Sequence, residues 1–340
     1  MRSEAGYKRE KKLNLSGLPT IIFTFLICAA CWIIGYYGLT DSPVRSGSGA
    51  SSLLWDVVCR ILPMEIHKHY LIGFFLLCLG AAFLQRFNFL FIIIKEKTTL
   101  PFLLFLLLNS VNPDFYPFQP VSLAMFLLLF ALFELYGSFQ KSNAIGRIFN
   151  MMVYLSIGSL LWPYLLLFTP VFWFGMYRFR ILSFRTFMAS LLGVFTVGWF
   201  VLGWCAWKHD WGVFINFAQC IADIRFVFTQ ESRLLEWLTP FWVLFFMIVV
   251  SIHISLLKHE NTSRTHHFIF FLLIFGVFSF IVSMFYAPNS ANFQCIFYIP
   301  ASIIVSSAFS GKYGIATFLL FYLFMLLLIV LFFVRIWNFL

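Results

Sequence analysis

The sequence predicts an all-α integral membrane protein with about eleven transmembrane helices. Hydrophobic residues make up 62% of the chain and charged residues only 11%, which is too few charges to cover the surface of a water-soluble fold. Apolar runs of about 18 residues, the length that a helix needs to cross the hydrocarbon layer, recur along the whole chain. The short alternating segments of a membrane β-barrel do not occur. Helices are therefore expected, because a helix satisfies its backbone polar groups within one apolar segment.

Each predicted span is an apolar run bounded by polar or charged residues. Residues 1–17 form a basic cytoplasmic head with no convincing signal-peptidase site, which predicts a retained first span. Residues 18–340 are expected to form a single transmembrane domain. Several spans are short and are expected to be tilted, buried in the bundle or paired in a re-entrant hairpin. The spans are Leu18–Leu39, Tyr70–Leu84, Leu100–Val111, Val121–Tyr136, Ile148–Leu161, Tyr164–Met176, Phe187–Trp207, Trp237–Leu257, Phe268–Tyr286, Phe293–Ala308 and Ile315–Val334.

The distribution of Lys and Arg over alternate loops predicts the orientation. With the amino terminus inside, 16 of the 23 Lys and Arg residues fall on the inside and seven on the outside. The positive-inside rule therefore predicts a cytoplasmic amino terminus and an outside carboxyl terminus. The same bias explains the net charge of +10 better than nucleic-acid binding does.

Two outside segments, residues 40–69 and 208–236, are too long to be turns. In the first, the stretch SLLWDVVCRIL has apolar residues at helical spacing, which predicts a helix lying on the membrane surface. The second mixes aromatic and charged residues, and part of it is expected to form another interfacial helix. All five aspartates also fall outside in this map. Ordinary solvation and an extracytoplasmic site that uses carboxylates both account for them.

Motifs with a sharp chemical meaning are scarce. There is no phosphate-binding glycine loop, HExxH or GxSxG motif, and no set of residues with metal-ligand spacing. Cys28 and Cys31 have CxxC spacing inside the first span, where simple packing is expected. Glu134 and His253 lie within predicted spans, so packing or snorkelling and a functional role both remain open. No cofactor is indicated, and a divalent cation stays open.

Residues 148–203 carry a recognisable order of features. A Gly-containing helix leads to a Pro-bearing turn, an apolar helix then ends in a basic stretch, and a second Gly-containing span follows. The residues are Gly158, Pro163, Pro170, Arg178, Arg180, Arg185, Gly193 and Gly198. In these features, and in the layout from Leu18 to Glu236, the chain resembles the glycosyltransferase C superfamily and a group of bacterial membrane proteins with the same organisation. The resemblance implies transfer of a sugar from a polyprenyl-phosphate-linked donor at the extracytoplasmic face of a bacterial inner membrane.

The resemblance also implies site residues. In the superfamily an acidic residue of the first outside loop acts as general base or supports the donor site, and Asp41 lies in the corresponding place, with Asp56 as second choice. A carboxylate near an acceptor hydroxyl can remove its proton as the sugar transfers. The chain departs from many members because its first loop has no adjacent acidic pair. The outside basic residues that could hold the donor phosphate are Arg45, Arg60, Lys208 and Arg225.

Two other hypotheses fit the same residues. A non-catalytic subunit or scaffold of an envelope-assembly or transport complex would have a membrane protein partner and no active site. A transporter would need polar residues along a path through the spans, for which Glu134 and His253 are the candidates. Membrane lipids are partners under every hypothesis, a polyprenyl-phosphate sugar under the first, and nucleic acid under none.

Overall fold

The structure is a computed structural model that describes residues 18–39, 53–61, 66–94, 98–141, 143–209, 211–226, 234–256, 263–310 and 315–339, and these residues contain helices and no strand. The α-helices are α1 (Leu18–Leu39), α2 (Leu53–Ile61), α3 (Ile66–Phe91), α4 (Leu100–Ser110), α5 (Pro120–Gly137), α6 (Ile145–Leu161), α7 (Thr169–Arg178), α8 (Phe184–Lys208), α9 (Gly212–Ala222), α10 (Leu234–Leu256), α11 (Ser263–Phe285), α12 (Ser290–Ala308) and α13 (Ile315–Phe339). Three short 3₁₀ turns are η1 (Pro113–Phe115), η2 (Pro163–Phe168) and η4 (Ala287–Asn289).

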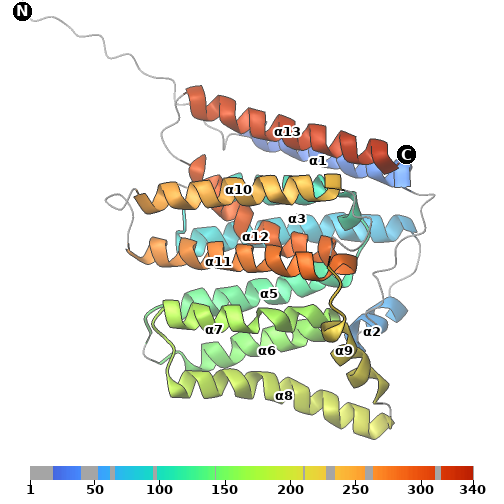
Figure 1. Cartoon of the computed structure of the whole chain (residues 1–340), viewed down its shortest axis with the longest axis vertical. Coiled ribbons are helices and arrows are strands. Elements are labelled where there is room, and N and C mark those ends of the chain that lie inside the picture. The colour runs from blue at the N-terminus through green and yellow to red at the C-terminus, as the bar shows by residue number, and fades with distance from the viewer. Residues whose placement is uncertain are drawn as a thin grey trace, which may run out of the picture.

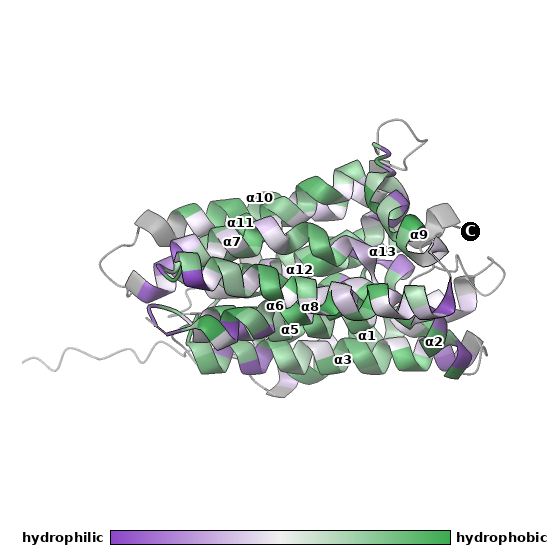
Figure 2. Ribbon diagram, turned by 90° about the horizontal axis from the view of Figure 1, so that it is seen from below, coloured by the Kyte–Doolittle hydropathy of each residue, from purple (hydrophilic) through white to green (hydrophobic). Residues whose placement is uncertain are grey.

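Every predicted span contains a helix of the structure. Six helical segments, in α1, α3, α5, α8, α11 and α12, are long and apolar enough to cross a membrane, and shorter apolar stretches lie in α4, α6, α10 and α13. Hydrophobic residues dominate the middle of the helices, and hydrophilic residues gather toward their ends (Figure 2). This pattern fits an all-α membrane protein.

The long helices run side by side in one bundle, with α1 and α13 along one edge and α8 along the other (Figure 1). The centre belongs to α12, which packs against α4, α10 and α11. Within the apolar segment of α12, 83% of the residues are buried. Almost all of α4 is buried too. This short helix was expected to be tilted, buried or part of a re-entrant pair, and it lies buried in the bundle.

One predicted span, Tyr164–Met176, does not form a single helix. The 3₁₀ turn η2 covers Pro163–Phe168, and α7 starts after it at Thr169. Pro170 lies in the first turn of α7, where its missing N–H costs no hydrogen bond. Further inside one continuous helix, the same ring would clash with the carbonyl of residue 166, so the chain changes helix type there.

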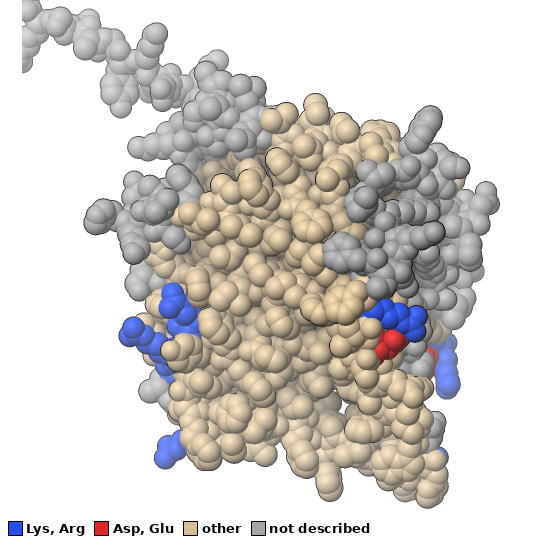
Figure 3. Space-filling view, in the orientation of Figure 1, with Lys and Arg blue, Asp and Glu red and all other residues tan. Residues whose placement is uncertain are grey.

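Charged residues collect at the two ends of the bundle and leave an uncharged band between them (Figure 3). The end that carries α2 and α9 is called the α2–α9 end. The charged residues whose side chains the structure describes there are Asp56, Arg60, Lys68, Asp114, Lys208, Asp223 and Arg225. The opposite end, called the basic end, has Arg86, Glu134, Lys141, Arg147, Arg178, Arg180, Arg185 and Arg264. Acids and bases are therefore nearly balanced at one end, and bases prevail at the other.

A glycine permits the close packing of α8 against α6. A Cβ at Gly193 would lie 2.8 Å from the backbone oxygen of Phe149 and 2.9 Å from the Cβ of Met152. Such small residues let two helix backbones approach each other inside a membrane. Gly198, farther along α8, has no atom within 4 Å of its Cβ position. The two helices are therefore tightly joined near Gly193 and less closely packed toward the α2–α9 end.

Candidate functional site

Helix α2 is the short amphipathic helix that the first outside loop was predicted to contain. Its residues Leu54 and Val58 pack against the core, while Asp56 and Arg60 are exposed on its other face. Asp56 lies in the first turn and Arg60 in the last, so each charge complements the helix dipole. On a third side, the ring of Trp55 lies 5.1 Å from that of Phe118 in the loop before α5. Packing on both sides holds α2 across the end of the bundle.

An apolar groove lies between α2, α6 and α8, with a volume of about 560 Å³. In Figure 3 the surface is open between α6 and α8 at this end of the bundle. The polar side-chain groups of the lining are the Thr196 hydroxyl, which donates to the carbonyl of Leu192 at 2.6 Å, and the indole N–H of Trp204. The lining residues are Leu54 and Val57 of α2, Val153, Ile157 and Leu160 of α6, and Thr196, Val197, Phe200, Val201 and Trp204 of α8.

The groove suits an apolar chain. Its volume is that of an ordinary ligand pocket, but its lining offers a polar ligand only the bonded Thr196 hydroxyl and the Trp204 indole N–H. Phe200 is 72% exposed and Trp204 is 52% exposed, so the groove opens on the side of α8. This opening gives a hydrocarbon chain a lateral way into the groove.

Charged groups lie where the groove meets the α2–α9 end. The ammonium group of Lys208 is 5.0 Å from the ring centroid of Trp204, a groove residue, in a cation–π contact. Arg60 and Asp56 are carried by α2, the helix that forms one wall. Lys208, a predicted phosphate ligand, therefore contacts a groove residue, whereas Asp56 and Arg60 share α2 with two groove residues and are not themselves part of the lining. The groove itself was not foreseen from the sequence.

Arg225, the remaining described candidate for phosphate binding, belongs to a different part of this end. Its guanidinium group forms an ion pair with Asp223, with a 2.9 Å contact at each carboxylate oxygen. Its backbone nitrogen donates to the carbonyl of Phe285 at 2.9 Å, and Ala287 N–H donates to the Arg225 carbonyl at 3.0 Å. Arg225 thus ties the segment after α9 to the turn between α11 and α12, and a neighbouring carboxylate compensates its charge.

The thiol of Cys59 on α2 is not activated as a nucleophile. Burial, and after it the charge of Asp56, raises the pKa of this thiol. A thiol must lose its proton to attack, so a raised pKa disfavours that role. At the same end of the bundle, the Tyr164 hydroxyl accepts a hydrogen bond from Asn289 at 3.0 Å.

Two predicted site residues, Asp41 and Arg45, lie outside the described residues. So does the side chain of His253. Among the residues that the structure describes, no group of three or more His, Cys, Asp or Glu could hold a metal ion.

Sequence reasoning missed a buried polar network under the α2–α9 end. It joins two loops that contain no Lys or Arg, residues 112–119 (NPDFYPFQ) and residues 287–294 (APNSANFQ). Asn112 donates to Gln294 at 3.3 Å and Asn292 donates to Asn289 at 3.5 Å, all four side chains being buried. Buried polar groups need partners, and the Asn112–Gln294 bond links the two loops, whereas the Asn292–Asn289 bond lies within the second loop. The feature of the sequence that could have indicated this network is the group of amide side chains at the ends of the apolar segments.

Comparison of the chain with protein-family models, with curated proteins and with solved structures gave no match.

Proposed function

We propose that the protein binds a lipid-linked sugar, with the lipid chain in the groove between α2, α6 and α8, and transfers the sugar at the α2–α9 end. The observation that carries this proposal is a groove lined almost entirely by apolar groups, whose residue Trp204 is in contact with the Lys208 ammonium group. A polyprenyl phosphate has the matching chemistry, a long branched hydrocarbon chain attached to an anionic phosphate. The likeness of the central sequence to the glycosyltransferase C superfamily supports the same donor.

The proposed reaction assigns one role to each kind of residue. A carboxylate, Asp56 or Asp41, takes the proton of the acceptor hydroxyl. The acceptor oxygen then forms a bond to the anomeric carbon of the sugar as the bond to the donor phosphate breaks. The leaving polyprenyl phosphate carries the electron pair, and Arg60 and Lys208 stabilise its negative charge.

The charge distribution supports a bilayer orientation for this proposal. The basic end has seven described cations and one acid, whereas the α2–α9 end has four cations and three acids. The positive-inside rule then puts the basic end in the cytoplasm and the groove end outside, with the eleven α-helices other than α2 and α9 crossing or entering the inner membrane of a bacterium. A lipid-linked donor would reach the groove from the outer leaflet.

Substitution of the carboxylates tests the chemistry. Asp56→Asn and Asp41→Asn, alone and together, are assayed in proteoliposomes for transfer of a radiolabelled sugar from a polyprenyl-phosphate donor to acceptors extracted from the host envelope. Loss of the general base is expected to lower the rate by about 10²–10⁴-fold. Asp223→Asn is the matched control, because Asp223 is a carboxylate of the same end that pairs with Arg225 away from the groove. Full activity in the double variant would exclude both assigned bases.

The rival function is that of a non-catalytic subunit of an envelope-assembly or transport complex. One observation favours it: Asp56 is exposed and has no hydrogen-bond or ion-pair partner among the described residues that would orient it as a base. Purification from membranes distinguishes the two functions. A stable protein partner, together with no polyprenyl lipid bound by the purified protein, supports the rival.

A further inference from the structure

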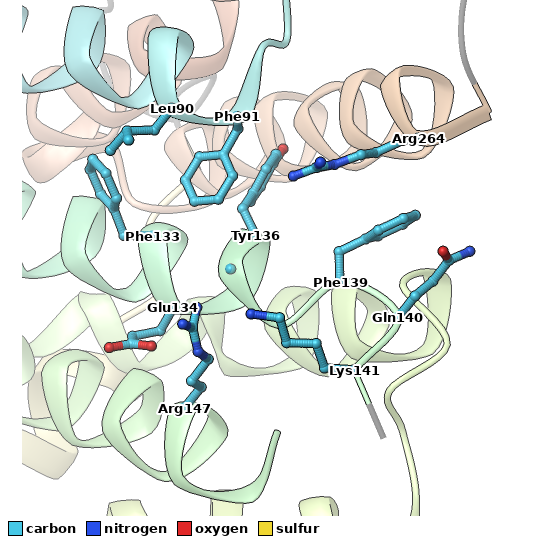
Figure 4. A pocket seen from close by; sticks show the side chains of 11 residues that line it. Leu90, Phe91, Phe133, Glu134, Tyr136, Phe139, Gln140, Lys141, Arg147 and Arg264 are labelled. Carbon is cyan, nitrogen blue, oxygen red and sulfur yellow. The ribbon is translucent and has the colours of Figure 1, made fainter. Parts of the chain in front are cut away.

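A second, larger pocket lies at the basic end, between the ends of α3 and α5 and the starts of α6 and α11. Its volume is about 1050 Å³. The side chains of Lys141, Arg147 and Arg264 extend toward this space from three separate segments, and Glu134 lies at its edge (Figure 4). Within the described part of the chain none of the three cations forms an ion pair. Their positive charge is therefore available to a ligand.

Two of these cations occupy places that a helix disfavours. Arg147 lies in the first turn of α6 and Arg264 in the first turn of α11. The amino-terminal end of a helix is the positive end of its dipole, so a cation there is unfavourable unless an anion is close by. Glu134 is the one described carboxylate in the lining, and it forms no ion pair with either arginine. The two helix starts and the three side chains together create a field that favours an anion.

The cations are also held in position. The guanidinium carbon of Arg264 lies 5.1 Å from the ring centroid of Phe268 and 5.9 Å from that of Phe139. The Nη1 atom of Arg147 occupies the place where a Cβ of Gly137 would be, so a larger residue at the end of α5 would require the arginine to shift. Such preorganisation lowers the entropy lost when the side chains bind an anion.

One wall of the pocket is aromatic and reaches the lipid-facing surface. Phe91 and Phe133 form this wall with ring centroids 5.8 Å apart, and Leu90 beside them is 51% exposed. The Tyr136 hydroxyl, which is the polar group of this wall, already donates to the Phe268 carbonyl at 3.0 Å. The pocket thus joins a cationic site at the membrane surface to an apolar surface along α3 and α5, which is the shape of a phospholipid with its headgroup and chains.

We propose that this pocket binds an anionic phospholipid, with the phosphodiester on Lys141, Arg147 and Arg264 and the acyl chains along Leu90 and Phe133. Basic pockets between transmembrane helices are suited to such headgroups. Glu134 sets the selectivity: its carboxylate accepts a hydrogen bond from a headgroup hydroxyl and repels a headgroup carboxylate. A glycerol headgroup, as in phosphatidylglycerol, is therefore preferred over serine. This site is independent of the proposed sugar transfer.

Binding is tested on the full-length protein in nanodiscs of phosphatidylcholine doped with phosphatidylglycerol or phosphatidylserine, with retained lipid counted by native mass spectrometry. The expected result is preferential retention of phosphatidylglycerol. The variant with both Arg147→Gln and Arg264→Gln is expected to lose at least about tenfold in this preference, because charge-assisted phosphate contacts are the strong ones. Arg185→Gln is the control, since Arg185 is an exposed arginine of the same end outside the pocket. It should retain the preference.

Three outcomes would overturn the proposal. They are equal retention of phosphatidylcholine, an equal loss in Arg185→Gln, and displacement of the lipid by millimolar glycerol phosphate, which would identify a soluble phosphate ester as the ligand. Glu134→Gln should raise phosphatidylserine retention toward that of phosphatidylglycerol, and an unchanged ratio would contradict the selectivity. Adding phosphatidylglycerol should raise the melting temperature of the unsubstituted protein and leave that of the double variant unchanged. This measurement distinguishes a loss of binding from a loss of folding.

Discussion

The two cavities of this protein lie at opposite ends of one bundle and differ in the way they hold charge. The groove beside α2 is smaller, about 560 Å³, and no charged residue lines it, although the Lys208 ammonium group contacts its residue Trp204. The pocket at the basic end is about 1050 Å³ and has three unpaired cations among its lining residues. The comparison shows how two cavities in one protein can differ in the ligand that they suit. A cavity lined by apolar groups suits a hydrocarbon chain, and a cavity lined by charged groups suits an anion.

Filling the groove should have the largest effect. Val153→Trp inserts an indole into the wall formed by α6, and we expect at least tenfold weaker binding of a photoreactive polyprenyl phosphate because the space for its chain is lost. Phe195→Trp is the control, since Phe195 is exposed on α8 outside the groove. Crosslinking yield in membranes measures both variants. Retention of phosphatidylglycerol should stay unchanged in Val153→Trp. If this variant lost binding of both lipids, the two cavities would not be independent sites.

The contact between α6 and α8 can be broken separately. Gly193→Ala places a methyl group against the Phe149 backbone oxygen, and overpacking of this kind costs about 1–3 kcal/mol of unfolding free energy. Gly198→Ala meets no atom within 4 Å and should leave stability unchanged or slightly improved. Thermal unfolding in detergent compares the two. Equal melting temperatures would mean that the close approach at Gly193 does not hold the groove walls together.

Salt concentration should affect ligand binding at the two cavities differently, and we expect this difference to be smaller than the effects above. Raising the ionic strength from about 0.1 M to 1 M shortens the Debye length from about 10 Å to 3 Å. Retention of phosphatidylglycerol at the basic end should fall several-fold, because its binding rests on exposed cations. Binding of the polyprenyl chain in the groove should change little, since burial of apolar surface does not depend on screening. The same salt dependence at both cavities would show that charge governs both.

The smallest expected effect concerns the thiol on α2. The pKa of Cys59 is raised by burial and then by the charge of Asp56, so alkylation, which needs the thiolate, should begin at a higher pH than for a free cysteine. Asp56→Asn removes the lesser cause and should move the pH profile of Cys59 alkylation downward by less than about one unit. Cys220, whose neighbouring charge is Asp223, should not respond. Mass spectrometry of iodoacetamide-treated protein measures both, and a shift of Cys220 would show a global change.

Much of the architecture could be predicted from local patterns. Apolar runs between charged loops located the spans, and the spacing of Leu54, Val57, Val58 and Ile61 located α2. Helix type in the sixth span could not be read in this way. Apolar composition there favours a helix, but Pro163 and Pro170 divide the segment into a 3₁₀ turn and an α-helix. Hydropathy reports burial in lipid and is insensitive to this backbone restriction.

The sites were less predictable than the spans, and the reason is distance along the chain. Arg60 and Lys208 were identified as candidate phosphate ligands because they are cations in outside loops, and Arg225 was chosen on the same ground. Only the folded chain decides that Lys208 contacts a groove residue while Arg225 pairs with Asp223. A count of charges by loop treats these cations alike, since it contains no information about partners.

The sequence by itself determined the class of the protein, the positions of its helices and the unequal charge of its two ends. These properties depend on composition and on patterns within about 20 residues, the scale of one membrane-spanning helix. The tertiary structure alone decided where cavities form and which side chains line them. Residues 54, 153 and 204 meet in the groove and residues 141, 147 and 264 in the basic pocket because helices distant in sequence pack together.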